Sequence, residues 1–131
     1  MKLLNIIALS ALTLWACPNT NLTEARTRPV MRITTGNVLT WGNNNYGQLG
    51  DGTNADKFSG VDVVIDSLGQ PLTNVVAVAA GGGSTYVIKS DGTVWAWGSN
   101  QRGQLGDGTI IDSLIPVQVQ GLTGVQAVAA G

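Results

Sequence analysis

The 131-residue sequence contains no histidine and a single cysteine, and only 11% of its residues are charged. The absence of histidine excludes a serine–histidine triad, a histidine metal site and a histidine general base. A single cysteine excludes an internal disulfide and a cysteine-rich zinc site. The net charge of −1 provides no basic field for nucleic acid. We therefore predict a protein that is not an enzyme, with no catalytic residue, metal, cofactor or nucleic-acid partner.

An apolar run follows a short positive start at Met1 and Lys2. The run extends from Leu3 to Ala16, which is shorter than the ~20 residues that a spanning helix needs. A charged start, an apolar core of this length and a small residue at its end are typical of a signal peptide. We predict that residues 1–16 are such a signal; the alternative is a buried amphipathic helix.

The sequence Leu14-Trp15-Ala16-Cys17 resembles the bacterial lipobox, although Trp15 is larger than the residue usual there. This resemblance implies cleavage before Cys17 and lipidation of its thiol, which would anchor the protein to a membrane of the bacterial cell envelope, facing the periplasm or the exterior. The alternative is a plain secretory signal and a secreted protein. Residues 17–33 lack strand or helix periodicity and are rich in Asn, Thr and Pro, so we predict a flexible linker.

The remainder of the chain repeats itself. Ten of thirteen positions are identical between WGNNNYGQLGDGT at 41–53 and WGSNQRGQLGDGT at 97–109. The offset between the two copies makes Trp97 the equivalent of Trp41. A second pair, VVAVAAG at 75–81 and VQAVAAG at 125–131, shares six of seven positions. A period of about 50 residues is typical of propeller blades and too long for leucine-rich repeats.

Short β-branched and aromatic runs within each repeat predict strands separated by glycine turns. The turns include Ser90-Asp91-Gly92 and the glycines at 81–83. No window has sustained helical spacing. The predicted strands are Asn37–Trp41, Val61–Ile65, Val75–Ala79, Thr85–Lys89, Thr93–Trp97, Pro116–Val119 and Val125–Ala129.

The motif D-G-x-V-x-x-W-G-x-N-x-x-G-Q-L-G-x-G, present in full at 91–108, resembles the repeats of the regulator-of-chromosome-condensation family. The copy at 35–52 departs only at Thr35, and Ser84 stands where the family usually has histidine. The resemblance implies a seven-bladed β-propeller over residues 34–131, in which glycines adopt special backbone conformations and tryptophans pack between blades. The implied structural residues are Trp41, Gly42, Gly47, Gln48, Leu49, Gly50, Trp97, Gly98, Gly103, Gln104, Leu105 and Gly106.

Seven predicted strands supply fewer than two blades, whereas propellers have ~4 to 8 blades of four strands. We therefore predict an all-β fold that is a partial β-propeller, a fragment of a seven-bladed one. Further blades would come from a longer chain or from other copies of this one.

Paired carboxylates at Asp51 and Asp107 are interpreted as turn residues that accept local backbone N–H groups. A calcium loop at Asp51, Thr53 and Asp56 has incomplete ligand spacing. Tyr46 and Arg102 occupy equivalent variable positions of the repeated motif, and we predict that they contact a partner.

Two functions remain open. The first is a protein-interaction scaffold in the cell envelope that binds an unknown extracellular or periplasmic protein. The second is the N-terminal part of a larger secreted propeller enzyme, carbohydrate-active or a lyase, with catalytic residues beyond this chain. Binding of DNA or histones is disfavoured because residues 33–131 contain three basic and seven acidic side chains.

Overall fold

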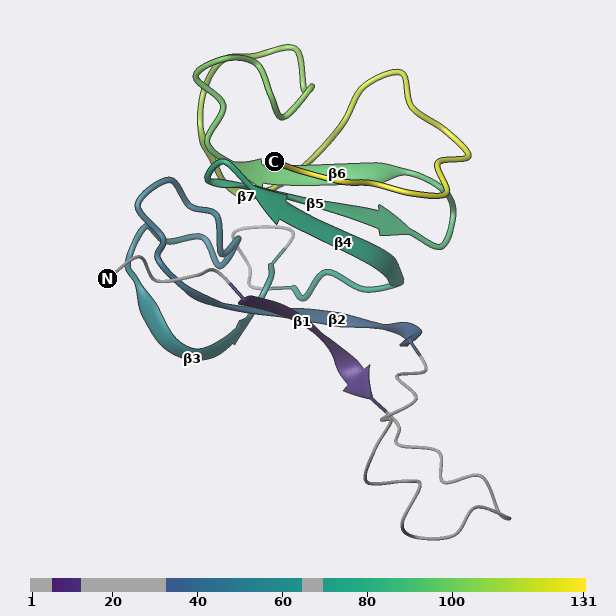
Figure 1. The fold of residues 1–131 in the computed structure, drawn as a ribbon, viewed down its shortest axis with the longest axis horizontal. Coiled ribbons are helices and arrows are strands. Elements are labelled where there is room, and N and C mark those ends of the chain that lie inside the picture. Colours follow the sequence, from purple (N-terminus) through teal and green to yellow (C-terminus); the bar gives the residue numbers. More distant parts are fainter. Residues whose placement is uncertain (1–5, 13–32, 65–69) are drawn as a thin grey trace, which may run out of the picture.

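The computed structural model describes residues 6–12, 33–64 and 70–131 (Figure 1). Within these ranges the chain forms seven β-strands, as expected for an all-β protein. The same ranges contain no helix long and apolar enough to cross a membrane. Cys17 and the rest of the predicted linker up to residue 32 lie outside the described residues.

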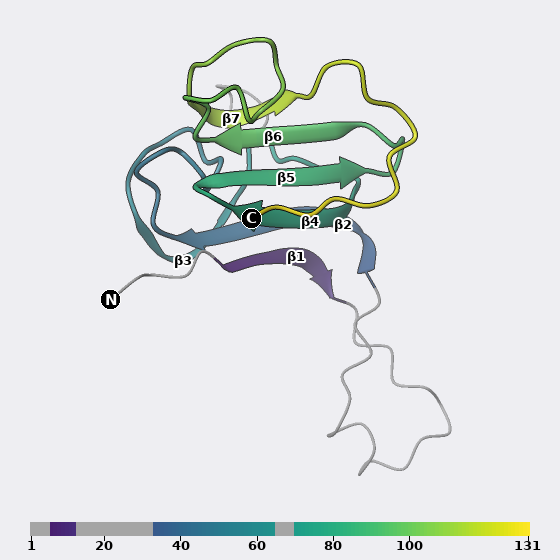
Figure 2. The same ribbon diagram turned by 45° about the horizontal axis from the view of Figure 1, so that its top comes forward.

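In the structure we call the unit that starts at Val75, with the first copy of the VVAVAAG segment, the second repeat. It forms a four-stranded antiparallel meander, seen as a stack in Figure 2. Its strands are β4 (Val75–Gly81), β5 (Ser84–Lys89), β6 (Val94–Gly98) and β7 (Ser113–Gln118). The predicted hairpin between β5 and β6 is confirmed, because the N–H of Gly92 donates to the carbonyl of Lys89 at 2.8 Å. The glycines at 82 and 83 form the tight turn between β4 and β5 with positive φ angles of 57° and 81°.

The first repeat forms a three-stranded unit with the same registers. Its strands are β1 (Ile6–Leu12), β2 (Ile33–Gly42) and β3 (Lys57–Asp62). Thr40 of β2 pairs with Val61 of β3, and the equivalent Ala96 of β6 pairs with Val117 of β7. In both pairs, the residues of the second repeat keep the sequence offset that relates Trp97 to Trp41. The repeated sequence therefore folds in the same way twice.

Strand β1 takes the place in the first repeat that β5 takes in the second. Ile6 pairs with Trp41 of β2, just as Thr85 pairs with Trp97 of β6. The described chain is the uncleaved sequence, so signal-peptide cleavage stays a prediction. In this uncleaved form, part of the predicted signal, residues 6–12, covers one edge of β2.

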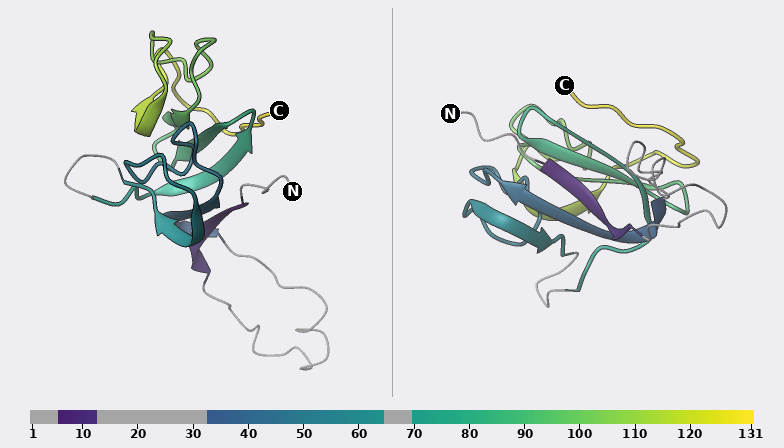
Figure 3. Two further views of the ribbon diagram at one scale, coloured as in Figure 1. Left: turned by 90° about the vertical axis from the view of Figure 1, so that its left-hand side faces the viewer. Right: turned by 60° about the horizontal axis from the view of Figure 1, so that its bottom comes forward.

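The two units contact each other through a shared apolar core. Strand β2 is joined to β4 by a single pair, Gly36 with Val75, and the two units lie side by side (Figure 3). The N–H of Gly52 in the first unit also donates to the carbonyl of Leu114 in the second at 3.1 Å. The core cluster contains residues from both units, namely Val38, Val63, Leu72, Val75, Val87 and Trp97. Strands with apolar residues on both faces are thereby buried against a neighbouring unit.

Two predicted strands differ in the structure. The strand predicted at Val61–Ile65 instead begins at Lys57 and ends at Asp62. The segment Val125–Ala129 is not a strand. In the first copy of this segment, β4 pairs along its length with β5, whereas the second copy has no equivalent partner among the described residues. The second copy lies beside β4, where the backbone of Gly131 approaches Gly81 (Figure 2).

Candidate functional site

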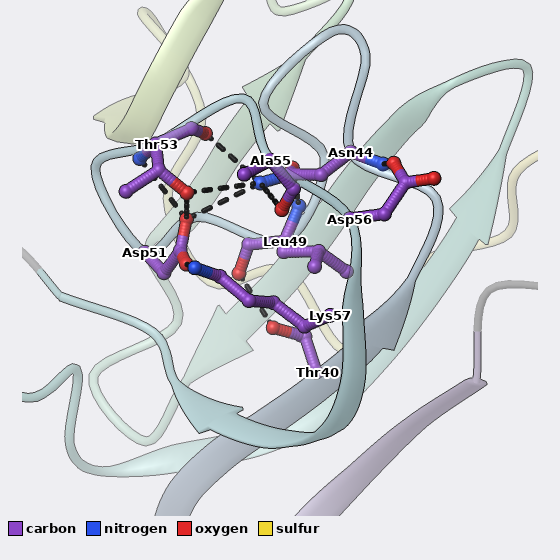
Figure 4. Close-up of polar contacts among 8 residues, drawn as sticks. All are labelled: Thr40, Asn44, Leu49, Asp51, Thr53, Ala55, Asp56 and Lys57. Carbon is purple, nitrogen blue, oxygen red and sulfur yellow. Dashed lines mark hydrogen bonds and ion pairs between the residues drawn. The ribbon is translucent and has the colours of Figure 1, made fainter.

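The repeated sequences at 41–53 and 97–109 form two similar loops, which we call the first and second motif loops. Asn44 organises the first of them from a fully buried position (Figure 4). Its Nδ2 donates to the carbonyls of Thr53 at 2.9 Å and Ala55 at 3.2 Å. Its Oδ1 accepts the N–H of Leu49 at 2.9 Å. One amide side chain therefore joins both ends of the loop.

Asn100 makes the same contacts in the second motif loop. Its Nδ2 donates to the carbonyls of Thr109 and Ile111, both at 3.1 Å. Its Oδ1 accepts the N–H of Leu105 at 2.9 Å. Asp112 accepts the backbone N–H of Asn100 at 2.7 Å, as Asp56 does for Asn44 at 2.8 Å. Leu49 and Leu105, which follow the glutamines of the motif, are both fully buried.

Asp51 and Asp107 act as turn residues, as predicted. Asp51 Oδ1 accepts the N–H and the hydroxyl of Thr53 at 3.0 and 2.7 Å. Burial opposes ionisation of Asp51, but the hydrogen bonds from Thr53 and Lys57 outweigh it and lower the pKa of the carboxyl. The pKa of Asp107 is lowered chiefly by the backbone N–H of Thr109. Lowered pKa values and fixed local partners are the properties of structural carboxylates.

The second repeat packs directly on the first motif loop. The indole N–H of Trp97 and the hydroxyl of Thr85 both donate to the carbonyl of Gln48 at 2.9 Å. Trp97 is fully buried there, which confirms the expectation that this tryptophan packs between units. One backbone carbonyl of the first loop thus accepts two hydrogen bonds from the next repeat.

Two glycines make this close packing possible. A Cβ added at Gly50 would lie 2.7 Å from Nε1 of Trp97, and one added at Gly47 would lie 2.8 Å from the Cα of Leu114. Both glycines also have positive φ angles, of 69° and 77°. Their lack of a side chain therefore serves both the turn and the contact with the neighbouring repeat.

The second motif loop has no such neighbour among the described residues. Gly103, Gln104 and Gly106 are half-buried, whereas their counterparts Gly47, Gln48 and Gly50 are buried. Trp41 is likewise half-buried, whereas Trp97 is fully buried. Gly42 and Gly98, which end β2 and β6, share positive φ angles of 113° and 100°. The two loops therefore have the same conformation and different surroundings.

Tyr46 and Arg102 lie at the same turn of consecutive repeats. Each backbone N–H donates to the side-chain oxygen of the following glutamine, Gln48 or Gln104, at 2.9 Å. Tyr46 is 43% exposed and lies beside the turn at Gly83, and Arg102 is exposed. Both side chains are held at the surface by a rigid loop, and their predicted contact with a partner stays a prediction.

Sequence reasoning missed the residues that organise these loops. The motif includes Asn44 and Asn100 without indicating a role for them, and Asp56 and Asp112 lie outside the identical run. A sequence pattern could have identified these two aspartates, since they keep the offset that relates Trp41 to Trp97. Phe58 and Leu114 also keep this offset, although their different side chains hid the equivalence.

Buried polar side chains in the described ranges are engaged in structural contacts. No buried side-chain nitrogen or oxygen in this part of the chain lacks a hydrogen-bond partner. The same residues include no group of three or more acidic, cysteine or histidine side chains placed to hold a metal ion. The exposed residues at the loop tips are therefore the candidates for contacts with other molecules.

Comparison with known families gives matches over most of the chain. The model of the regulator of chromosome condensation (RCC1) repeat matches residues 35–88 and 91–131. Human HERC4, named as a probable E3 ubiquitin-protein ligase, is 39% identical over 79 residues, covering 60% of this chain and 7% of that protein. The ultraviolet-B receptor UVR8 of Arabidopsis thaliana is 33% identical over 97 residues, covering 72% of this chain and 21% of the receptor.

Solved structures give the same fold. Prp20p of Saccharomyces cerevisiae, in a structure described with its binding to Gsp1p and histones, superposes with a TM-score of 0.53 at 18% identity. The match covers 73% of this chain and 25% of Prp20p. Human WBSCR16 superposes with a TM-score of 0.53 at 24% identity, over 72% of this chain and 24% of that chain. The chain spans a quarter or less of each of these relatives and structures.

Proposed function

Because the chain belongs to the regulator of chromosome condensation (RCC1) repeat family, we propose that it acts as a protein-interaction scaffold. Its blades present the two motif loops at one end of the sheet, with Tyr46 and Arg102 at their tips. The partner is a protein outside the cytoplasm that contacts this end of the propeller.

One observation carries the proposal: the shared asparagine that organises each loop is buried, whereas the residues at the loop tips, which differ between the two loops, are exposed. Asn44 and Asn100, which are the same residue type, are fully buried and hydrogen-bonded. Tyr46 and Arg102, which differ in chemistry, are exposed. A rigid frame with variable exposed tips is the arrangement that binding proteins use, because the frame holds the contact residues at little entropic cost.

The solved structures support a binding role in general terms. The yeast Prp20p structures are described with Gsp1p, histones and Kap60. The charge of this chain argues against a histone-like or nucleic-acid partner, since residues 33–131 carry three basic and seven acidic side chains. A neutral or weakly basic protein surface suits this composition better.

Photo-crosslinking tests the scaffold proposal. A photoreactive amino acid is placed at position 46 or 102, and, as a matched control, at the exposed Ser90 in the hairpin at the opposite end of the blade. We expect adducts of one common mass from positions 46 and 102 and none from position 90. Equal adducts from all three positions, or none from 46 and 102, would contradict the proposal.

We propose further that the scaffold is anchored to a membrane of the bacterial cell envelope through a lipid on Cys17. The support is the sequence around that residue: a positive start, an apolar run and the lipobox-like Leu14-Trp15-Ala16-Cys17. Several acyl chains on one residue would hold the protein more firmly than the marginal binding of one chain. The linker would then separate the blades, which begin with β2 at Ile33, from the membrane.

Metabolic labelling tests the anchor. Cells that express the full chain are fed radioactive palmitate, and the Cys17→Ser chain is the control. Label in the original chain and loss of label in the variant are expected. Unchanged labelling of Cys17→Ser would overturn the lipid anchor while leaving the scaffold proposal intact.

A further inference from the structure

Two adjacent isoleucines are exposed at the tip of the second motif loop. Ile110 and Ile111 are each 71% exposed, and among the large hydrophobic side chains of the described residues only Phe58 is more exposed. Single exposed apolar side chains are ordinary on a protein surface, whereas contiguous ones favour a contact site. The isoleucine pair is therefore a candidate for contact with another molecule.

A neighbouring repeat would not cover this pair. The counterparts of the two isoleucines in the first motif loop are Asn54 and Ala55. The second repeat packs on that loop through Trp97, and yet Asn54 and Ala55 are both exposed. A repeat packed in the same way on the second motif loop would leave positions 110 and 111 exposed as well.

The backbone of the isoleucine pair is held by the loop. The carbonyl of Ile111 accepts Nδ2 of the fully buried Asn100 at 3.1 Å. The N–H of Ile111 donates to Oγ1 of Thr109 at 3.3 Å, and this hydroxyl donates to Oδ1 of Asp107 at 2.9 Å. A contact residue on a fixed backbone loses little conformational entropy when a partner binds.

Arg102 lies near the isoleucine pair. A Cβ added at Gly103 would lie 3.8 Å from the carbonyl oxygen of Thr109. The turn that carries Arg102 therefore lies beside the segment that leads into Ile110. The exposed cation and the exposed apolar pair belong to one surface of the loop.

Tyr46 of the first motif loop borders the same surface. A Cβ added at Gly83 would lie 3.2 Å from Cδ2 of Tyr46 and 3.6 Å from Cβ of Ser99. The tyrosine ring is thereby close to Ser99, where the second motif loop leaves β6. The two predicted contact residues and the isoleucine pair thus lie at the same end of the sheet.

This end of the molecule has an excess of negative charge. The two motif loops and the residues that follow them, 41–57 and 97–113, contain four aspartates and two cations, Lys57 and Arg102. Nζ of Lys57 lies 3.4 Å from Oδ2 of Asp51, so this cation is already paired. Charge complementarity therefore favours a partner with basic side chains around the contact.

We propose that Ile110 and Ile111 are the apolar anchor of the partner contact and insert into an apolar pocket of a protein, bordered by Lys or Arg side chains. The inference rests on the scaffold function proposed above and names the chemistry of its partner. An apolar centre with a charged rim is the usual arrangement of protein interfaces.

A lipid surface matches these observations less well. Strand β2 begins at Ile33, at the opposite end from the motif loops, so a membrane anchor that precedes it reaches the far end first (Figure 1). The excess of aspartates around the isoleucines would also be repelled by anionic headgroups.

The affinity of the crosslinked partner tests the inference. The protein that forms adducts with position 102 is identified, purified and titrated, in a nonionic detergent, with the full chain and with a chain that carries both Ile110→Asn and Ile111→Ala. These are the residues of the first motif loop, where the same hydrogen bond holds the backbone, so the variant is expected to fold.

Leu122→Ser is the matched control. Leu122 is 44% exposed, and it belongs to the 121–124 turn, in which Gly124 lies against Gly92 of the hairpin at the opposite end of the blade. It is thus an exposed apolar residue of the same repeat that lies away from the proposed contact.

We expect the double isoleucine variant to bind at least about tenfold more weakly and Leu122→Ser to bind like the original chain. A photoreactive residue at position 110 should crosslink to a partner segment that contains apolar residues with Lys or Arg beside them. The affinity of the original chain should decrease as salt is added, because the charges at the rim are screened.

Three outcomes would overturn the inference. Unchanged affinity of the double variant, or an acidic crosslinked segment, would do so while the adducts at positions 46 and 102 left the scaffold function intact. No adduct from either position would overturn both. Sedimentation with vesicles of phosphatidylcholine and phosphatidylglycerol gives the third: binding that is lost in the double variant and kept in Leu122→Ser would assign the isoleucines to a lipid surface.

Discussion

The two motif loops have nearly the same sequence and the same internal hydrogen bonds, yet they differ in burial. In the first loop Gln48 and Gly50 are buried beneath Trp97, whereas in the second loop Gln104 and Gly106 are only half-buried. The difference separates two roles that the repeated motif combines. Its asparagine and aspartates build the loop locally, and its glycines, glutamine carbonyl and tryptophan connect one repeat to the next.

Equivalent substitutions in the two repeats should therefore lower the unfolding free energy by different amounts where the side chain contacts the neighbouring repeat. Where it contacts only its own loop, the two losses should be equal. The chain therefore contains its own control for each substitution, at the equivalent position of the other repeat. Each pair below is compared by urea unfolding of the full chain.

The largest difference is expected for the tryptophans. Trp97→Ala removes a fully buried indole and its hydrogen bond to Gln48, and it should cost about 3–5 kcal/mol of unfolding free energy. Trp41→Ala removes a half-buried side chain and should cost less than half as much. Equal losses for the two variants would show that burial by the neighbouring repeat contributes little.

A smaller difference is expected for the first glycines of the two loops. Gly47→Asn places a side chain against the backbone of Leu114 and should cost about 1–3 kcal/mol through overpacking. Gly103→Asn meets open space and should cost only the strain of a positive φ, which asparagine tolerates. A shift in urea midpoint of similar size for both would contradict the assignment of Gly47 to the contact between repeats.

Features that are built locally could be predicted from the sequence, whereas features that depend on a neighbouring segment could not. The strands around Trp41 and Trp97 and the hairpin at 90–92 were predictable, because alternation and turn residues are local signals. The absence of a strand at Val125–Ala129 was not predictable, since a strand needs a partner and that partner is not encoded in the segment itself. The role of Asn44 was hidden for a related reason, since its burial depends on what the rest of the chain brings to the side chain.

The asparagines should show no difference. Asn44→Ala and Asn100→Ala each remove an amide that accepts the N–H of the buried leucine of its loop. Leaving that buried N–H without a partner should cost about 1–3 kcal/mol in either repeat. The two urea midpoints should shift alike; a larger shift for Asn44→Ala would show that the neighbouring repeat also depends on the loop's internal network.

The smallest difference concerns Asp51 and Asp107. Hydrogen bonds lower the pKa of both carboxyls in the folded chain, so their stabilisation is present above the unfolded pKa, about 3.9, and is lost as the pH falls through the folded value. As the pH is lowered past about 4, the unfolding free energy of the original chain should therefore decrease. In Asp51→Asn or Asp107→Asn this decrease should be less steep. Among the residues that the structure describes, only Asp51 of this pair has a cation partner: Nζ of Lys57 lies 3.4 Å from its Oδ2.

That ion pair should be worth less than about 1 kcal/mol and should weaken with salt. At neutral pH, added sodium chloride should therefore reduce the difference in unfolding free energy between the original chain and Lys57→Ala. The corresponding difference for Ser113→Ala, the counterpart in the second repeat, should not change with salt. A salt effect of equal size at both positions would show that the response belongs to the whole chain and not to the pair. The first loop would then differ from the second only in the repeat packed upon it.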